Sequence, residues 1–279
     1  MPTASRFFSM PPERVTQRDE ARFFGALKTG NDTFKRTEHG RLAAIDAWLI
    51  RHIRASGAVP RSALDIGISS GVTTVDLVTA LEQAGYPVRF TGIDRSLEAR
   101  LVDVAPLCRV LLEPNGHILQ YEVAGRAIHP WRRRLDYADG MILLRGLLHR
   151  WLDARARRSL ARDGGKQVLL VSPRLGGSAA VDLMESDITL SDPRLTGRFD
   201  LVRAANILNR HYFDPPSLQR AIVNVRSSLR GPGAWLLVVR TLEDGSHHGS
   251  LMRMEQGGGL AVVARCGNGS EVEPLFTDQ

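Results

Sequence analysis

The hydrophobic positions of this chain alternate between short continuous runs and residues at helical spacing, which predicts strands alternating with helices. Helical spacing extends over residues 72–84 and 214–230, and each stretch ends at a glycine. The continuous runs predict strands at residues 63–67, 88–93, 167–171, 181–185, 199–204 and 234–240. Two more strands, near residues 250–255 and 260–266, are joined by three glycines and predict a terminal hairpin. This order predicts an open, doubly wound, mostly parallel α/β sheet.

Other segments interrupt this alternation. Ser96 predicts the start of a short helix that runs to Leu101, because serine is a favoured helix N-cap. Farther along, an Asn-Gly pair between two apolar runs predicts a hairpin. The segment after it predicts a long helix over residues 137–162. The hairpin and this helix are expected to form a hairpin-plus-helix lid, inserted at residues 105–165.

The domain organisation follows from these segments. Apolar residues at helical spacing within residues 16–56 predict helices before the first strand. We therefore expect an N-terminal helical extension, residues 1–59, that covers the rest of the protein. Residues 60–279 are expected to form one α/β domain that contains the insert.

The turn between the first predicted strand and the next helix is the sharpest local feature, with the sequence Asp65-Ile66-Gly67-Ile68-Ser69-Ser70-Gly71. Small residues let a ligand approach the backbone closely, and the N-terminus of the following helix favours negative charge. Asp94 closes the next strand. A carboxylate at that point either accepts the hydroxyls of a ribose that lies over the first turn or caps a helix.

Two cofactor classes use such a turn. The dinucleotide fingerprint G-x-G-x-x-G would fall on Gly67, Ser69 and Val72, so two of its three glycines are missing. The pattern acidic-x-G-x-G-x-G falls on Asp65, Gly67, Ser69 and Gly71, with one glycine replaced by serine.

With these residues the chain resembles the class I S-adenosylmethionine-dependent methyltransferases over residues 60–245. The resemblance also rests on Ser186-Asp187-Ile188, Phe199-Asp200-Leu201-Val202 and Ser228-Leu229-Arg230-Gly231-Pro232-Gly233-Ala234-Trp235-Leu236. It implies a Rossmann-like sheet of seven strands with an antiparallel hairpin at one edge. It also implies S-adenosyl-L-methionine as the cofactor.

The resemblance assigns roles to single residues. The turn Gly67–Gly71 would hold the methionine part of the cofactor and Asp94 its ribose. Asp187 would lie near the adenine amino group, the Ile188 backbone beside the ring, and Asn206 at the border of the cofactor. The predicted cofactor-binding residues are Asp65, Gly67, Ile68, Ser69, Gly71, Asp94, Arg95, Asp187, Ile188 and Asn206.

Candidate acceptor-facing residues follow the fourth strand, since open α/β sheets bind ligands at the carboxyl ends of their strands. Asn209, His211 and Tyr212 are candidates to face the acceptor, and His211 is a candidate base. The alternative is that His211 and Tyr212 are packing or solvated loop residues. The segment Asp214-Pro215-Pro216-Ser217 is only superficially similar to the Asp-Pro-Pro-Tyr signature of amino-methylating nucleic-acid enzymes, because it starts a helix and ends in serine.

Composition places the chain among globular proteins. Its 279 residues are 43% hydrophobic and 24% charged, which excludes collagen-like and low-complexity chains. Cys108 and Cys266 are too few for a cysteine-based zinc framework, and we predict no metal site. We find no secretory signal and no apolar run of about 18 residues. The expected location is the cytoplasm, with peripheral membrane contact as an alternative.

The net charge of +7 is carried almost entirely by arginine, because only Lys28, Lys35 and Lys166 of the 37 basic residues are lysines. Arginines concentrate in and before helix 137–162, which also carries Trp151. They are Arg132, Arg133, Arg134, Arg145, Arg150, Arg155, Arg157, Arg158 and Arg162, and the apolar residues are Met141, Leu144, Leu148, Trp151 and Leu152. A helix of this kind is typical of contact with an anionic membrane, or of a lid packed on the core. No specific nucleic-acid signal remains.

We therefore expect an S-adenosylmethionine-dependent methyltransferase that acts on a small-molecule or lipid-like acceptor. Two other classes stay open. An NAD(P)-dependent oxidoreductase would use a similar fold, although the fingerprint glycines are missing. A non-catalytic S-adenosylmethionine-binding module is the second alternative, because the sequence does not identify a catalytic acid or base.

Overall fold

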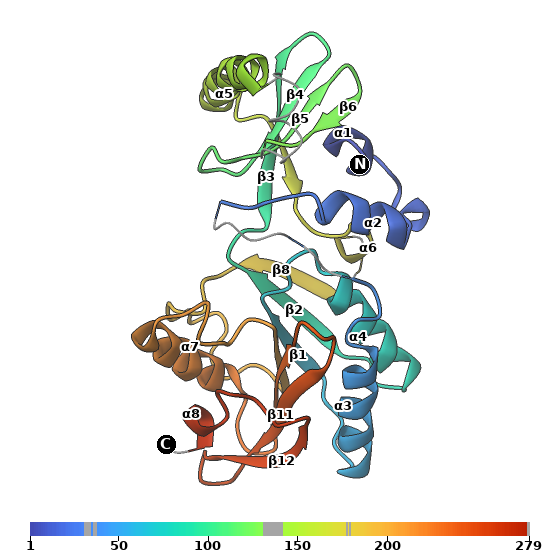
Figure 1. Ribbon diagram of the computed structural model, residues 1–279. Coiled ribbons are helices and arrows are strands. Elements are labelled where there is room, and N and C mark those ends of the chain that lie inside the picture. The colour runs from blue at the N-terminus through green and yellow to red at the C-terminus, as the bar shows by residue number, and fades with distance from the viewer. Residues whose placement is uncertain (31–34, 36–37, 131–141, 177, 179, 278–279) are drawn as a thin grey trace. The chain divides into compact units, whose positions relative to one another are not determined.

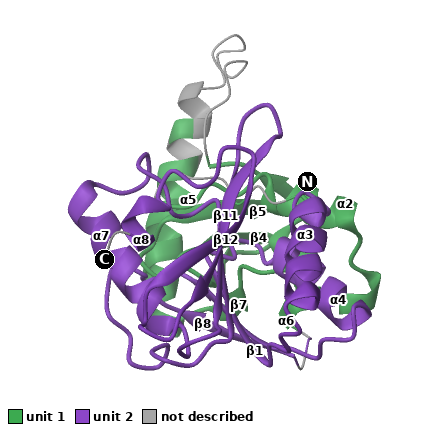
Figure 2. Cartoon of the chain, turned by 90° about the horizontal axis from the view of Figure 1, so that it is seen from below, with its two compact units in different colours: residues 1–38, 96–177 green, residues 39–95, 178–279 purple. Residues whose placement is uncertain are grey.

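Two β-sheets divide the chain into two compact units. The computed structural model describes residues 1–279 except 31–34, 36–37, 131–141, 177, 179 and 278–279 (Figure 1). The side chains of residues 142–145, 147 and 148 also lie outside the description. Unit 1 comprises Met1–Glu38 with Ser96–Gly177, and unit 2 comprises His39–Arg95 with Ser178–Gln279 (Figure 2).

Unit 2 contains a seven-stranded sheet in the order β12-β11-β10-β9-β1-β2-β8. Its strands are β1 (Ser62–Ile66), β2 (Arg89–Asp94), β8 (Val181–Glu185), β9 (Leu201–Ala205), β10 (Trp235–Thr241), β11 (His247–Met254) and β12 (Leu260–Cys266). Strands β8, β2, β1, β9 and β10 are parallel to their neighbours, whereas β11 and β12 pair in antiparallel fashion. The predicted mostly parallel sheet with an antiparallel terminal hairpin is confirmed.

Helices cover both faces of this sheet, as Figure 1 shows. Helices α3 (Ala43–Ala55) and α4 (Val72–Gln83) contact each other on one face, and α7 (Pro215–Ser228) and α8 (Pro274–Thr277) contact each other on the other. The start of α7 follows the prediction. The Asp214 carboxylate accepts the Ser217 amide, and prolines in the first turn have no amide proton to leave unpaired.

Burial of both faces explains why the strand sequences are almost continuously apolar. Leu64 and Ile66 of β1 and Val202 and Ala204 of β9 belong to the core on the α7 side. Side chains alternate along a strand. Residues between these positions therefore face the layer of α3 and α4, where β9 places an arginine, Arg203, that is 1% exposed.

Unit 1 contains a five-stranded sheet in the order β6-β5-β4-β3-β7, with every neighbouring pair antiparallel. Its strands are β3 (Glu98–Ala105), β4 (Cys108–Leu112), β5 (Ile118–Val123), β6 (Arg126–Ile128) and β7 (Lys166–Leu169). Its helices are α1 (Ala4–Phe7), the 3-10 helix Pro12–Arg14, α2 (Gln17–Phe24), α5 (Ile142–Asp163) and α6 (Pro173–Gly176). The predicted hairpin around Asn115-Gly116 is the pair β4–β5.

Two apolar clusters cover the two faces of this second sheet. On one face, Phe7 of α1 stacks on Phe23 of α2 at 4.1 Å between ring centroids, and both pack with Leu111 and Leu119. On the other face, Leu152 and Ala156 of α5 are buried together with residues of β3, β4 and β5. Helices α1 and α2 therefore cover one face of this sheet, and helix α5 covers the other.

The structure differs from two expectations for these segments. The prediction of a helix from Ser96 is wrong, because β3 occupies Glu98–Ala105 and pairs with β4 on one side and β7 on the other. The predicted boundaries at residues 59, 105 and 165 also differ from those of the units. Residues 1–38 pack on the inserted sheet, and the helix at Ala43–Ala55 belongs to unit 2. The predicted start of helix 137–162 lies outside the described residues.

Candidate functional site

The turn between β1 and α4 has an unusual backbone. Gly67, Ser69 and Gly71 adopt φ angles of 71°, 57° and 73°, all in the left-handed region. Glycine adopts that region freely, whereas other residues incur strain. Ser69, which replaces a glycine in the pattern quoted above, is therefore held in a glycine-like conformation.

Hydrogen bonds fix this turn to the end of β2. The amides of Gly67 and Ile68 donate to the Ile93 carbonyl at 2.8 and 3.1 Å. The amide of Ser69 donates to Asp94 Oδ2 at 2.7 Å. Four residues that the sequence predicted for the cofactor site, Gly67, Ile68, Ser69 and Asp94, thus lie together at the carboxyl edge of β1 and β2.

Two features of the turn leave polar groups suited to a ligand. Ser70 is fully buried, and its hydroxyl oxygen has no hydrogen-bond partner within the described part of the chain. Gly71 precedes α4 and offers no side-chain cap, and the first turn of α4 holds no acidic residue. Uncapped amides at a helix N-terminus favour an anionic group such as a carboxylate.

Asp65 lies beneath the turn in a buried ion network. Arg203 donates through Nε and Nη2 to the two carboxylate oxygens of Asp65, at 2.9 and 2.6 Å, and through Nη1 to Asp46 Oδ1 at 3.2 Å. The Thr74 hydroxyl donates to Asp65 Oδ2 at 2.7 Å. The network therefore ties β1, β9, α3 and α4 together, and both oxygens of Asp65 are engaged within the protein.

The network contains two carboxylates for one guanidinium. Burial raises the pKa of Asp46 to about 6, although Arg203 partly offsets this effect. The second carboxylate oxygen of Asp46 is buried without a hydrogen-bond partner among the described residues. Burial disfavours the charged form of Arg203, yet Asp65 and Asp46 together raise its pKa above the usual value.

A second polar group lies at the end of β8. The Ser186 amide donates to the Asp94 carbonyl at 3.0 Å, which places the ends of β8 and β2 side by side. Asp187 accepts two hydrogen bonds from Thr189 and lies 3.6 Å from the Arg95 guanidinium. Burial disfavours the charged carboxylate, but these interactions outweigh it and lower the pKa of Asp187. Asp187 therefore remains an anionic acceptor at neutral pH.

The remaining predicted cofactor residues are held by backbone and side-chain contacts. The Ile188 carbonyl accepts a hydrogen bond from Asn224 of α7 at 2.8 Å. Asn206 has a left-handed φ of 60°, and its side-chain oxygen accepts the Thr241 amide at 2.6 Å. Ile207, which follows it, packs so closely on Gly67 that a Cβ at Gly67 would lie 3.2 Å from the Ile207 side chain. The β9 loop is therefore packed against the β1 turn.

The predicted catalytic residues His211 and Tyr212 are exposed, and the Tyr212 side chain is 60% accessible. Their backbone amides both donate to the side-chain oxygen of Asn209, each at 3.0 Å. Asn209 is buried and shapes the loop. No hydrogen bond or ion pair among the described residues joins the His211 ring to the turn at Gly67–Gly71.

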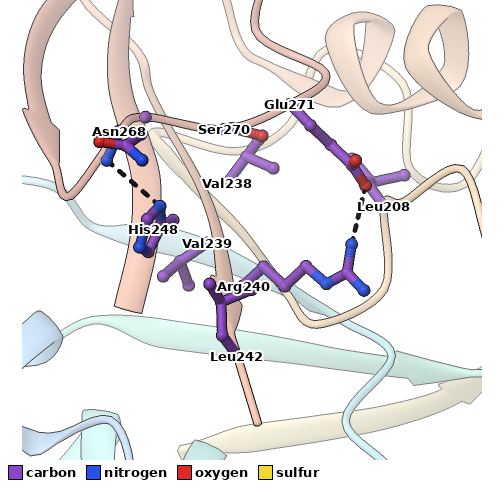
Figure 3. Close-up of a pocket in the computed structure, with 10 residues that line it drawn as sticks. Leu208, Val238, Val239, Arg240, Leu242, His248, Asn268, Ser270 and Glu271 are labelled. Carbon is purple, nitrogen blue, oxygen red and sulfur yellow. Dashed lines mark hydrogen bonds and ion pairs between the residues drawn. The ribbon is translucent and has the colours of Figure 1, made fainter. Parts of the chain in front are cut away.

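A cavity of about 240 Å³ lies beside the carboxyl ends of β9 and β10 (Figure 3). Leu208, Val238 and Val239 line it with apolar surface. Arg240 and Glu271 form an ion pair of 3.1 Å on one side, and His248 accepts the Asn268 amide on the other. The residues of the Gly67–Gly71 turn do not line this cavity. It combines an apolar floor with charged and hydrogen-bonding groups, as small-molecule sites commonly do.

The sequence interpretation missed Arg203, Asp46 and Thr74. A signal for Arg203 was present, because a single arginine inside an otherwise apolar strand requires a buried partner. It also missed the cavity, whose lining comes from three separate segments around residues 208, 238–248 and 268–271. No local pattern joins such segments.

No protein-family model matches the chain, and no curated protein matches it. Solved structures are similar to it at low identity. The CMeT domain of the citrinin polyketide synthase is 16% identical, with a TM-score of 0.37 over 72% of this chain and 35% of that one. This chain therefore spans only about a third of the length of that protein.

Two other similar structures contain methyltransferases with a bound ligand. The N-methyltransferase NodS from Bradyrhizobium japonicum, in complex with S-adenosyl-L-homocysteine, is 15% identical, with a TM-score of 0.34 over 80% of this chain and 71% of that one. CalS10, an amino pentose methyltransferase from Micromonospora echinaspora with bound SAM, is 17% identical, with a TM-score of 0.34 over 77% of this chain and 58% of that one. At this level of similarity a fold identifies neither a reaction nor a substrate.

Proposed function

We propose that unit 2 binds S-adenosyl-L-methionine at the carboxyl edge of β1, β2 and β8 and transfers its methyl group to a small-molecule acceptor. The main support for the proposal is the conformation of the turn at Gly67–Gly71. Its three left-handed residues and its hydrogen bond to Asp94 bring backbone, a buried hydroxyl and a carboxylate to one edge.

The residues of the edge suit the parts of this cofactor. Ser70 and the uncapped start of α4 would hold the amino-acid carboxylate. Asp94 would accept the ribose hydroxyls, and Asp187 with the Ile188 backbone would contact the adenine. Asp65 has a positioning role, because its oxygens are engaged by Arg203 and Thr74 and hold the strand and helix that flank the turn.

When bound, S-adenosyl-L-methionine supplies an electrophilic methyl group on a sulfonium. The contribution of the protein is then to position the acceptor in line with that group and to keep water away. The cavity at Leu208, Val238 and Arg240 is the acceptor site that we favour, because it lies beside the carboxyl ends of β9 and β10, and β9 is the strand that pairs with β1. A volume of about 240 Å³ suits a small molecule rather than a macromolecule. His211 and Tyr212 remain predictions for the acceptor side.

Calorimetric titration with S-adenosyl-L-methionine tests the proposal. We expect the unmodified protein to bind it. Asp94→Ala should weaken binding by roughly 100-fold, because the ribose hydroxyls and the Ser69 amide lose a charged acceptor. Asp94→Asn keeps an oxygen for the Ser69 amide and should weaken binding less.

Asp182→Ala is the matched control, because Asp182 is an exposed aspartate of β8 in the same sheet. Its affinity should equal that of the unmodified protein. No binding by the unmodified protein, or equal affinity of all three variants, would contradict the proposal. Binding without methyl transfer to a broad panel of small acceptors would support the non-catalytic module, and enhanced NADH or NADPH fluorescence on mixing would support an oxidoreductase.

A further inference from the structure

Helix α5 of unit 1 has one side packed on its sheet. Leu152 and Ala156 are 1% and 0% exposed and belong to a cluster with Val102 and Val110. On the same side, the Tyr121 hydroxyl donates to Asp153. These contacts show which face of α5 is buried. Its aliphatic residues Leu152 and Ala156 pack on the sheet and are therefore not accessible for insertion into a membrane.

The opposite side of α5 presents arginine. At 3.6 residues per turn, Trp151, Arg155, Arg158 and Arg162 form one stripe, and Arg150 and Arg157 flank it. Trp151 is 45% exposed, and the Arg155 guanidinium lies 4.6 Å from the centre of its ring. We call the six residues Arg150, Trp151, Arg155, Arg157, Arg158 and Arg162 the arginine face; all of them are exposed.

Carboxylates are almost absent from this face. Asp153 is on the buried side with Tyr121, and Asp163 pairs with Arg162. No described residue supplies a carboxylate partner for the other four arginines of the face. The acidic side chains Asp103 and Glu122 of the sheet pair with Arg109, and Glu122 accepts from Ser5 on the side of α1. Several unbalanced positive charges therefore remain along about 18 Å of one helix.

We propose that the arginine face of α5 docks unit 1 on an anionic lipid membrane by electrostatic adsorption, without insertion of the helix. The positive charges are complementary to a surface of anionic headgroups, and each arginine near such a surface contributes about a fivefold increase in partition. The exposed indole of Trp151 suits the headgroup layer, where tryptophan is enriched.

Co-sedimentation of the full chain with vesicles tests this docking. The vesicles consist of phosphatidylcholine alone or with about one third phosphatidylglycerol, at about 0.05 M and about 0.5 M NaCl. We expect binding only to the anionic vesicles and only at low salt. The triple variant Arg150→Gln, Arg155→Gln, Arg158→Gln should bind roughly 100-fold more weakly.

A control with the same loss of charge is Arg51→Gln, Arg54→Gln, Arg220→Gln, which alters exposed arginines on α3 and α7 of unit 2. It should retain most of the binding. Equal losses in both triple variants would show a mere net-charge effect and overturn the proposal. Binding that persists at high salt would show insertion instead of adsorption. Retention on single-stranded or duplex nucleic acid, without binding to anionic vesicles, would assign the face to nucleic acid.

Discussion

The buried ion network and the polar edge of unit 2 use the same residue type in different environments. Asp65 and Asp46 are 2% and 1% exposed and share Arg203. Asp94 ends β2 and Asp187 follows the neighbouring strand β8; both are partly exposed. Asp94 accepts a hydrogen bond from the turn, and Asp187 pairs with the exposed Arg95. Because the first pair is buried and bound to Arg203 inside the protein, it stabilises the fold. The second pair retains access to solvent, and therefore to a ligand.

The buried ion network and the polar edge are adjacent in the sequence. Asp65 precedes the Gly67–Gly71 turn by two residues. Thr74, whose hydroxyl donates to Asp65, lies at the start of α4, directly after that turn. The network thereby holds both ends of a strained loop whose middle faces the edge. Changes in the network should alter stability first, whereas changes at the edge should alter binding first.

Replacement of Arg203 is the change with the largest expected effect. Arg203→Met leaves Asp65 buried without its guanidinium, and removing one partner of a buried ion pair destabilises a protein by about 3–5 kcal/mol. Arg230→Met is the control, because Arg230 is half exposed in its pair with Asp200, and we expect a loss under about 1 kcal/mol. Urea unfolding of both variants would measure the difference, and similar losses would contradict the structural role of the network.

The pH dependence of stability should reveal Asp46. Burial raises its pKa to about 6 from the ordinary 3.8, so the folded protein binds this proton more tightly than the unfolded chain. The resulting stabilisation is fully present below pH of about 4 and is lost as the pH rises through 6, by up to about 3 kcal/mol.

Asp46→Asn removes this titration and still offers Arg203 an oxygen. The free energy of unfolding of the unmodified protein, minus that of the variant, should therefore fall between pH of about 4 and 7. Urea unfolding at several pH values measures that difference. A difference that stays constant with pH would show that Asp46 keeps an ordinary pKa in the folded protein.

Gly67→Ala tests the packing of the turn. The new methyl group would combine a left-handed φ with a contact of 3.2 Å to Ile207, and we expect a destabilisation of about 2 kcal/mol. Gly85→Ala shares the left-handed φ but has no atom within 4 Å of the new group. Thermal unfolding should show a smaller loss for Gly85→Ala, of about 1 kcal/mol. An equal loss would mean that Ile207 moves aside at no cost.

Ser69→Gly should have the smallest effect. It relieves a left-handed serine but also increases the freedom of the unfolded chain, so a stabilisation of at most about 1 kcal/mol is expected. The affinity for S-adenosyl-L-methionine should stay within a fewfold of the original, since the hydrogen bond of residue 69 to Asp94 uses a backbone amide. A large loss of affinity would instead assign a ligand contact to the Ser69 hydroxyl.

The sequence predicted unit 2 well because its strands carry strong local signals. The run at residues 234–239 is apolar on both faces, the run at residues 63–67 is interrupted only by Asp65, and Asp214-Pro215-Pro216 marks the start of α7. The turn residues followed from a local pattern as well, since Gly67, Ser69 and Gly71 occupy alternate, left-handed positions of a single turn.

Long-range contacts were not predictable in the same way. Arg203 is far along the chain from Asp65 and Asp46, and only the folded sheet and α3 bring them together. In unit 1 the contact between Phe7 and Phe23 and the pairing of β3 with β7 join distant segments. The helix predicted from Ser96 failed for this reason, because cross-strand pairing determined the structure of a segment whose first residue resembles a helix cap.

Amide chemical shifts recorded during titration with S-adenosyl-L-methionine show directly whether the cofactor binds at the Gly67–Gly71 turn. We expect saturable changes to concentrate at Ser69, Ser70, Asp94 and Ile188, while Asp46 and the strands of unit 1 change little. An absence of saturable changes at the Gly67–Gly71 turn, or changes centred on another part of the molecule, would contradict this expectation.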